Sequence, residues 1–155
     1  RDRLERILKK DPGFFEALVI KLLVAMGYGG SLNEAAGMVV GKSGDEGIDG
    51  IIKEDKLGLD NIYIQAKRWN NVVERPEVQK FVGALAGKGA TKGIFITTSS
   101  FSRGAREFKP QNNIKIVLID GNQLCEYMID YNIGVFTANT FEVKRIDIDF
   151  FESEE

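Results

Sequence analysis

Apolar side chains recur at intervals of three and four residues in three stretches of the chain, a spacing that predicts helices. The first helix is expected to begin after Asp11, an N-cap residue followed by a proline, and to end at Gly27. The second is an amphipathic helix over residues 75–87, and the third covers residues 121–131. Ser102 is expected to cap a further short helix.

Shorter apolar runs between these helices predict the strands of a sheet. Residues 48–54 and 61–67 are joined by a polar turn, which favours an antiparallel hairpin. Residues 93–98 and 114–119 are expected to be buried strands, and their alternation with helices indicates parallel pairing. The pattern therefore predicts an α/β fold, a central mixed β-sheet flanked by helices on both sides.

Two weaker patterns complete the chain. A glycine-rich region over residues 37–50 contains an apolar piece at 38–40, which predicts a strand followed by a tight loop. Residues 141–151 alternate in polarity, which predicts an edge strand before an acidic tail. The whole chain, 1–155, is expected to be one domain. Because it opens on Arg1, we expect a fragment of a longer protein.

Composition removes several classes of chemistry. Cys125 is the only cysteine, so the chain can build neither a disulfide framework nor a thiolate zinc site. The absence of histidine excludes serine–histidine and cysteine–histidine catalysis. No apolar run approaches the ~20 residues that span a bilayer, and no signal sequence opens the chain. We therefore expect a soluble domain in a reducing, cytoplasmic setting, without a membrane partner.

The net charge of −2 conceals an uneven distribution. Residues 65–109 carry nine basic and three acidic side chains, a net charge of +6. This segment is compatible with a phosphate-binding surface, although lysines on solvated helix faces would give the same count.

Oxygen donors and one lysine gather around the expected hairpin. Gln65 and Lys67 share one face of a strand, about 6 to 7 Å apart. Asp49 stands at the mouth of the hairpin beside the glycine-rich loop. Its carboxylate, the Gln65 amide oxygen and the Ala66 carbonyl suit Mg²⁺, with Mn²⁺ able to substitute. Lys67 could position and help deprotonate an attacking water.

Glu16 joins this set because it shares the apolar face of the first helix, where a carboxylate needs a partner or a cleft. Each residue also has an ordinary structural interpretation. Lys67 could be a solvated strand end, Gln65 a polar residue of an edge strand, and Asp49 a turn residue. Glu16 could be a member of a salt bridge.

Taken together, four segments resemble the PD-(D/E)xK nuclease superfamily, and specifically Mrr-type restriction endonucleases. They are Phe-Glu-Ala-Leu-Val at 15–19, Gly-Asp-Glu-Gly-Ile-Asp-Gly at 44–50, Gln-Ala-Lys at 65–67 and Gly-Ile-Phe-Ile-Thr-Thr at 93–98. The resemblance implies that Asp49 is the metal-bridging acid, Lys67 the catalytic lysine and Glu16 a supporting carboxylate.

The chain departs from the superfamily's name at two positions, and the Mrr-like branch shares both departures. Ile48 replaces the proline before the acid, and Gln65 replaces the acidic residue two positions before the lysine. A neutral amide binds a divalent cation less strongly than a carboxylate does, so metal affinity without DNA phosphate should be modest. Asp45 is a second candidate acid, for which we expect a turn or supporting role.

Hydroxyl and basic side chains after the strand over 93–98 form a candidate DNA-backbone surface. Its members are Thr98, Ser99, Ser102, Arg103, Arg106 and Lys109. Lys88 and Lys92 could extend it, while helix capping and a solvated helix face are the competing interpretations. Trp69 could stack on a base or pack against its own domain.

We therefore expect a Mg²⁺-dependent endonuclease that hydrolyses double-stranded DNA, type IV-like, in restriction of foreign or modified DNA. The family usually joins this domain to a separate DNA-recognition domain, and two cuts favour a homodimer. A repair or recombination nuclease acting on branched or damaged DNA is an alternative. An inactive DNA-binding or assembly module, prompted by Gln65 and the acidic C-terminus, is another.

Overall fold

The computed structural model describes residues 2–29 and 48–152 of the chain. The expected strand at 38–40 and the candidate acid Asp45 lie outside the described residues.

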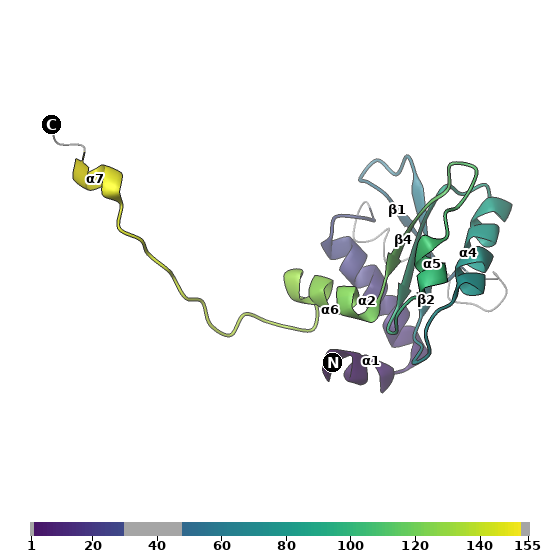
Figure 1. Cartoon of the computed structure of the whole chain (residues 1–155), viewed down its shortest axis with the longest axis horizontal. Helices are drawn as coiled ribbons and strands as arrows, with labels where there is room; N and C mark the ends of the chain where they lie inside the picture. Colours follow the sequence, from purple (N-terminus) through teal and green to yellow (C-terminus); the bar gives the residue numbers. More distant parts are fainter. Residues whose placement is uncertain (1, 30–47, 153–155) are drawn as a thin grey trace.

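A mixed sheet forms the centre of the described fold (Figure 1). Its strands are β1 (Gly50–Lys53), β2 (Asn61–Lys67), β3 (Lys92–Thr97) and β4 (Lys115–Ile119), in the order β1-β2-β3-β4. β1 pairs with β2 antiparallel, whereas β2, β3 and β4 run parallel to one another. The expected hairpin, the parallel pairings and the fold class are all confirmed.

One face of the sheet is covered by α1 (Asp2–Leu8), α2 (Pro12–Ala25) and α6 (Gly121–Asp130). Its core includes Phe15 of α2 and Ile64 of β2, both almost fully buried. α2 begins after Asp11 as expected, although the Asp11 side chain makes no capping hydrogen bond. Gly27 follows the helix with a φ of +104°, a backbone conformation that favours glycine. The pattern of apolar positions did not predict α1.

The other face is covered by α4 (Arg75–Gly87) and α5 (Arg103–Glu107), as Figure 1 shows. Phe95 of β3 meets Phe81 and Phe101 edge to face, at centroid distances of 5.5 and 5.4 Å. Gly93 permits α4 to lie close to the sheet, because an added Cβ would stand 2.7 Å from atoms of Leu85 and Phe81. The two faces thus have separate apolar clusters, with β2 and β3 between them.

β4 is a strand as expected, but it is not buried on both faces. It is an edge strand, and Val117 in its middle is 55% exposed. The continuous apolar run was misleading. Ile116 and Leu118 pack against the cluster under α4 and α5, whereas Val117 points to the opposite face, where α1, α2 and α6 leave it open. α6 follows directly, with Asp120 as its N-cap and Gln123 completing a capping box.

The end of the described chain corrects another prediction. Residues 135–147 have no regular structure, and only the short helix α7 (Ile148–Glu152) follows, so the expected edge strand over 141–151 is absent from the described chain. Figure 1 shows this segment running away from the sheet. The alternating polarity did not lead to a strand because the apolar side chains of the segment are exposed and contact no core that would fix one face inward. None of the described helices is long and apolar enough to cross a membrane.

Candidate active site

Asp49 is held against β2 by both its backbone and its side chain. Its backbone N–H donates to the Ile64 carbonyl at 2.7 Å and so extends the pairing of β1 with β2 by one residue. Its Oδ2 accepts hydrogen bonds from the Ala66 backbone N–H at 2.7 Å and from Gln65 Nε2 at 2.8 Å. The hairpin register therefore brings together three positions that the sequence predicted as metal ligands.

Gln65 is a buried polar residue with an unsatisfied acceptor. The side chain is 3% exposed, its Nε2 is used by Asp49, and its Oε1 has no hydrogen-bond partner. A buried acceptor without a donor costs free energy, about 1–3 kcal/mol in typical cases. A cation bound beside Asp49 would satisfy this oxygen.

Glu16 projects from α2 toward the same place. It lines a small cavity together with Asp49 and Ala66. Burial, and secondly the negative charge of Asp49, raise the pKa of the Glu16 carboxyl above its ordinary value of 4.5. A divalent cation beside Asp49 would relieve this unfavourable setting of the Glu16 carboxylate.

The donors fit a hard divalent metal ion. Glu16 and Asp49 supply carboxylate oxygens, and Gln65 supplies an amide oxygen that lacks a partner. Within residues 2–29 and 48–152 there is no cluster of three or more histidine, cysteine, aspartate or glutamate side chains. A metal ion here would therefore need the amide and backbone or water oxygens besides these two acids. The Ala66 N–H binds Asp49, and the role of the Ala66 carbonyl stays a prediction.

Lys67 lies on the same face of β2 as Gln65, and the two residues line one pocket together with Glu77 and Lys80 of α4. Its ammonium stands over the Trp69 ring, 5.1 Å from the ring centroid. It forms no ion pair with any residue in the described part of the chain. The structure therefore brings Asp49 into contact with Gln65, places Glu16 in a cavity with Asp49, and places Lys67 in a pocket with Gln65.

The candidate DNA-contacting hydroxyls mostly bind the protein itself. Thr98 Oγ1 donates to the Trp69 carbonyl at 2.8 Å, and Ser99 Oγ donates to the Asn70 carbonyl at 3.3 Å. Ser102 Oγ accepts from the Ala105 N–H at 3.2 Å and caps α5 as expected. The bonds of Thr98 and Ser99 tie the segment after Lys67 to the end of β3. Each of the three hydroxyls therefore already has a structural role.

The candidate basic side chains differ in the ion pairs that they form within the protein and in their exposure. Arg106 forms an ion pair with Asp120 at 2.8 Å. Arg103 pairs with Glu107 at 2.8 Å yet remains 90% exposed, and Lys109 is exposed. Arg103 and Lys109 are therefore the more available members of the expected DNA surface.

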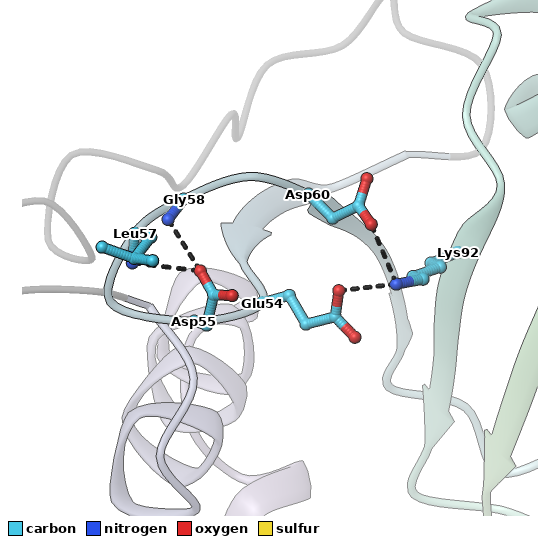
Figure 2. Close-up of polar contacts among 6 residues, drawn as sticks. All are labelled: Glu54, Asp55, Leu57, Gly58, Asp60 and Lys92. Carbon is cyan, nitrogen blue, oxygen red and sulfur yellow. Dashed lines mark hydrogen bonds and ion pairs between the residues drawn. The ribbon is translucent and has the colours of Figure 1, made fainter.

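Lys92 lies at the other end of the sheet. Its ammonium binds Glu54 at 2.5 Å and Asp60 at 3.0 Å, which ties the hairpin tip to the start of β3 (Figure 2). Lys67, by contrast, pairs with Thr97 at the end of β3. The Glu54 and Asp60 carboxylates also raise the pKa of the Lys92 ammonium. Lys92 therefore does not extend the candidate surface beside the site, contrary to our expectation.

Sequence reasoning missed several neighbours of Lys67. Glu77 and Lys80, which share its pocket, were assigned no role. Arg68 donates to the backbone carbonyls of Leu8 and Lys10, which links the end of α1 and the turn before α2 to the residue that follows β2. Two signals were available in the sequence. Arg68 directly follows the Gln-Ala-Lys segment, and Glu77 and Lys80 lie in the first two turns of the next helix.

Comparisons with known proteins agree with this geometry. The sequence model of the Mrr catalytic domain, described as restriction endonuclease, matches residues 7–128. The type IV methyl-directed restriction enzyme EcoKMrr of Escherichia coli (strain K12) is 47% identical over 149 residues, which cover 96% of this chain and 48% of that enzyme. The chain therefore spans about half the length of this curated relative.

Solved structures give the same result. The MspJI restriction endonuclease in complex with a 27-mer oligonucleotide has a TM-score of 0.63 and 26% identity, covering 86% of this chain and 32% of that one. The DNA modification-dependent restriction endonuclease AspBHI has a TM-score of 0.57 and 16% identity, covering 85% and 34%, and shares the fold. The resemblance inferred from the four sequence segments is thus confirmed, and the chain belongs to the Mrr-type restriction endonuclease family.

Proposed function

We propose that this chain is the catalytic domain of a metal-dependent endonuclease that hydrolyses phosphodiester bonds of double-stranded DNA in the restriction of modified DNA. The observation that carries the proposal is the contact of Asp49 with Gln65, whose Oε1 is buried and without a partner. Family membership supports the chemical class. The type IV methyl-directed activity in the name of one relative supports the choice of modified DNA.

Asp49, Gln65 and Glu16 would hold Mg²⁺, or Mn²⁺ in its place, with the Ala66 carbonyl as a further ligand. When bound, such an ion stabilises charge on the phosphate and acidifies a water molecule. The Asp49 carboxylate is already oriented for this role by the Ala66 N–H and the Gln65 amide. This orientation reduces the reorganisation that binding requires.

Lys67 would act on the phosphate and the attacking water. Its ammonium is on the Gln65 side of β2 and is not engaged by a carboxylate in the described chain. A lysine in this state can stabilise the negative charge that builds on the phosphate oxygens as the water attacks. It can also orient that water through a donated hydrogen bond.

Arg103 and Lys109 would contact the DNA backbone near the active site, with Thr98, Ser99, Ser102 and Arg106 supporting the surface. The choice of target would lie with a separate DNA-recognition domain, a proposal supported by the length of the curated relative, of which this chain spans about half. Cutting both strands calls for two active sites, which a homodimer supplies.

The proposal is tested with plasmids that differ only in DNA modification, incubated with Mg²⁺, Mn²⁺ or EDTA. We expect nicking or linearisation with either metal, none with EDTA, and a preference for modified DNA when the recognition domain is present. Cleavage that continues in EDTA would refute the metal dependence. Binding of DNA without any cleavage would instead identify an inactive binding module, and preference for branched DNA would identify a repair nuclease.

A further inference from the structure

Lys67 has one close partner in the described chain, the aromatic ring of Trp69. The two residues are two positions apart, and the ammonium lies 5.1 Å from the ring centroid. A cation over the face of an indole is attracted by the electron-rich ring. We propose that Trp69 is a positioning residue that orients the Lys67 ammonium for the phosphate, an inference that rests on the function proposed above.

The backbone around this pair is fixed on both sides. The Lys67 carbonyl accepts hydrogen bonds from Thr97 Oγ1 at 2.8 Å and from the Thr98 N–H at 3.2 Å. The Trp69 carbonyl accepts one from Thr98 Oγ1 at 2.8 Å. Two neighbouring residues at the end of β3 thus hold the backbone of both partners. The distance between ring and lysine stem is therefore set by the sheet rather than by a free loop.

The Trp69 ring is itself supported by the apolar core. It is partly buried and packs against the cluster that contains Val73, Phe95 and Phe101. Phe95 and Phe101 belong to the edge-to-face ring stack under α4 and α5. A ring anchored in this way can hold a flexible lysine stem, because the ring does not have to be ordered at the same time.

The type of contact suits a catalytic lysine better than an ion pair would. Glu77 lines the same pocket, yet Lys67 forms no ion pair with it. A carboxylate partner would compete with the phosphate for the ammonium and neutralise its charge. The ring leaves that charge intact and accepts no strong hydrogen bond. Lys67 can therefore be oriented before DNA arrives and still be released to the phosphate.

A different role for Trp69 would be stacking on a DNA base, since the residue also lines an open pocket with Arg68, Asn71 and Glu74. The two roles affect different kinetic constants. Loss of a base contact weakens DNA binding and raises KM, whereas loss of lysine orientation lowers kcat. Measuring both constants separates them.

The first arm of the test is spectroscopic and needs no activity. The Lys67 Nζ lies over the indole ring, so the NMR resonance of the protons on the adjacent ε-carbon should be shifted upfield in the metal-free chain from that of an ordinary lysine. We expect this shift to persist in Trp69→Phe and to vanish in Trp69→Leu. The corresponding resonance of Lys80, which shares the pocket, serves as the control and should be unchanged in both variants. A Lys67 resonance at the ordinary position would overturn the inference.

The second arm measures Mg²⁺-dependent cleavage of duplex DNA by the 155-residue chain and the same variants. Trp69→Leu should lose kcat about 3- to 30-fold, the range expected for a cation–π contact. KM for DNA should remain unchanged, and Trp69→Phe should recover most of the rate. Equal losses in the two variants, or an effect confined to KM, would overturn the inference.

The two arms keep the inference separate from the proposed function. If the chain cleaves no DNA, the proposed function fails, and the NMR shift still decides whether Trp69 orients Lys67. If the chain cleaves DNA but the Lys67 shift is absent, only the positioning role fails. Thermal unfolding of each variant shows whether a lost signal reflects a lost fold.

Discussion

Asp49 and Gln65 face each other across the β1–β2 hairpin, and Gln65 Nε2 donates a hydrogen bond of 2.8 Å to Asp49 Oδ2. The glutamine is thereby split in function. Its nitrogen fixes the acid, and its buried oxygen has no hydrogen-bond partner, which on the proposed function makes it the oxygen that a cation would bind. A glutamate here could not donate this bond while ionised, so the amide lets the site stay assembled without metal.

This relationship gives the first prediction. Gln65→Glu should lower the thermal unfolding temperature in EDTA, because it replaces an amide donor with a second carboxylate beside Asp49. Added Mg²⁺ should raise that temperature more in Gln65→Glu than in the parent chain, since a carboxylate binds the ion more strongly. Gln79→Glu, at an exposed position of α4, is the control and should respond to Mg²⁺ like the parent. An identical Mg²⁺ response in all three chains would contradict the ligand assignment.

A second prediction concerns Asp120, the N-cap of α6. Burial tends to raise the pKa of its carboxyl, but hydrogen bonds from Gln123, Arg106 and Asn122 outweigh this effect and bring the pKa below its ordinary 3.8. Its stabilising contribution is therefore present above pH 3.8 and is lost as the pH falls through the lowered value. Asp120→Ala should cost about 0.5–2 kcal/mol of unfolding free energy at neutral pH.

The measurement for Asp120 is urea-induced unfolding at neutral and acid pH. The difference between parent and Asp120→Ala should narrow as the solution is acidified. Asp130→Ala, exposed at the other end of α6, should leave stability almost unchanged at both pH values. A pH-independent gap for Asp120→Ala would show that its charge contributes nothing to the cap.

The third prediction tests the contact of α4 with the sheet. In Gly93→Ala, the new methyl group would stand 2.7 Å from atoms of Leu85 and Phe81, both fully buried. Overpacking of this kind should cost about 1–3 kcal/mol. Gly83→Ala on α4, where nothing lies within 4 Å, should instead stabilise the chain by about 0.5–1 kcal/mol through helix propensity. Chemical denaturation of the two variants measures whether each substitution lowers or raises the free energy of unfolding.

The fourth prediction compares the effects on DNA binding of basic residues at the two ends of the sheet. Arg103→Gln should weaken DNA binding and reduce the slope of log affinity against log salt by about 1, because Arg103 is exposed on α5, which follows the end of β3 that pairs with Lys67. Lys92→Gln should leave that slope unchanged, since Lys92 binds Glu54 and Asp60 at the far end (Figure 2). Fluorescence anisotropy with labelled duplex DNA at several salt concentrations measures the slopes. Equal slopes for the two variants would contradict this placement of the DNA.

The hairpin and the helices α2, α4 and α6 were predictable because each depends on local periodicity, whereas α1 was not predicted. The contact of Asp49 with Gln65 followed from the hairpin, since antiparallel pairing places residue 49 opposite residue 65. Edges were harder. The apolar run of β4 does not reveal that the helices leave Val117 open, and the alternation over 141–151 does not show whether a partner strand exists.

The direction in which long side chains point could also not be predicted from the sequence. Strand alternation placed Lys67 on the face of Gln65, but its flexible stem could reach Asp49, Glu77 or Trp69. The choice depends on the bonds that fix the Trp69 backbone to Thr98, a tertiary contact between β3 and the segment after β2. The direction of the Arg106 side chain is a similar case. Its ion pair with Asp120 joins α5 to the start of α6, a contact that the spacing of apolar residues does not reveal.

The central claim is that Asp49 and Lys67 perform metal-dependent hydrolysis of DNA. The most direct measurement is the single-turnover cleavage rate of a labelled duplex in Mg²⁺ for the parent, Asp49→Asn and Lys67→Met, with Asp130→Asn and Lys115→Met as exposed, charge-matched controls. Asp49→Asn and Lys67→Met should each lose at least about 100-fold in rate, as expected when a group that stabilises the transition state is removed. The two controls should cleave like the parent. Cleavage by Asp49→Asn or Lys67→Met at the parent rate would contradict the account.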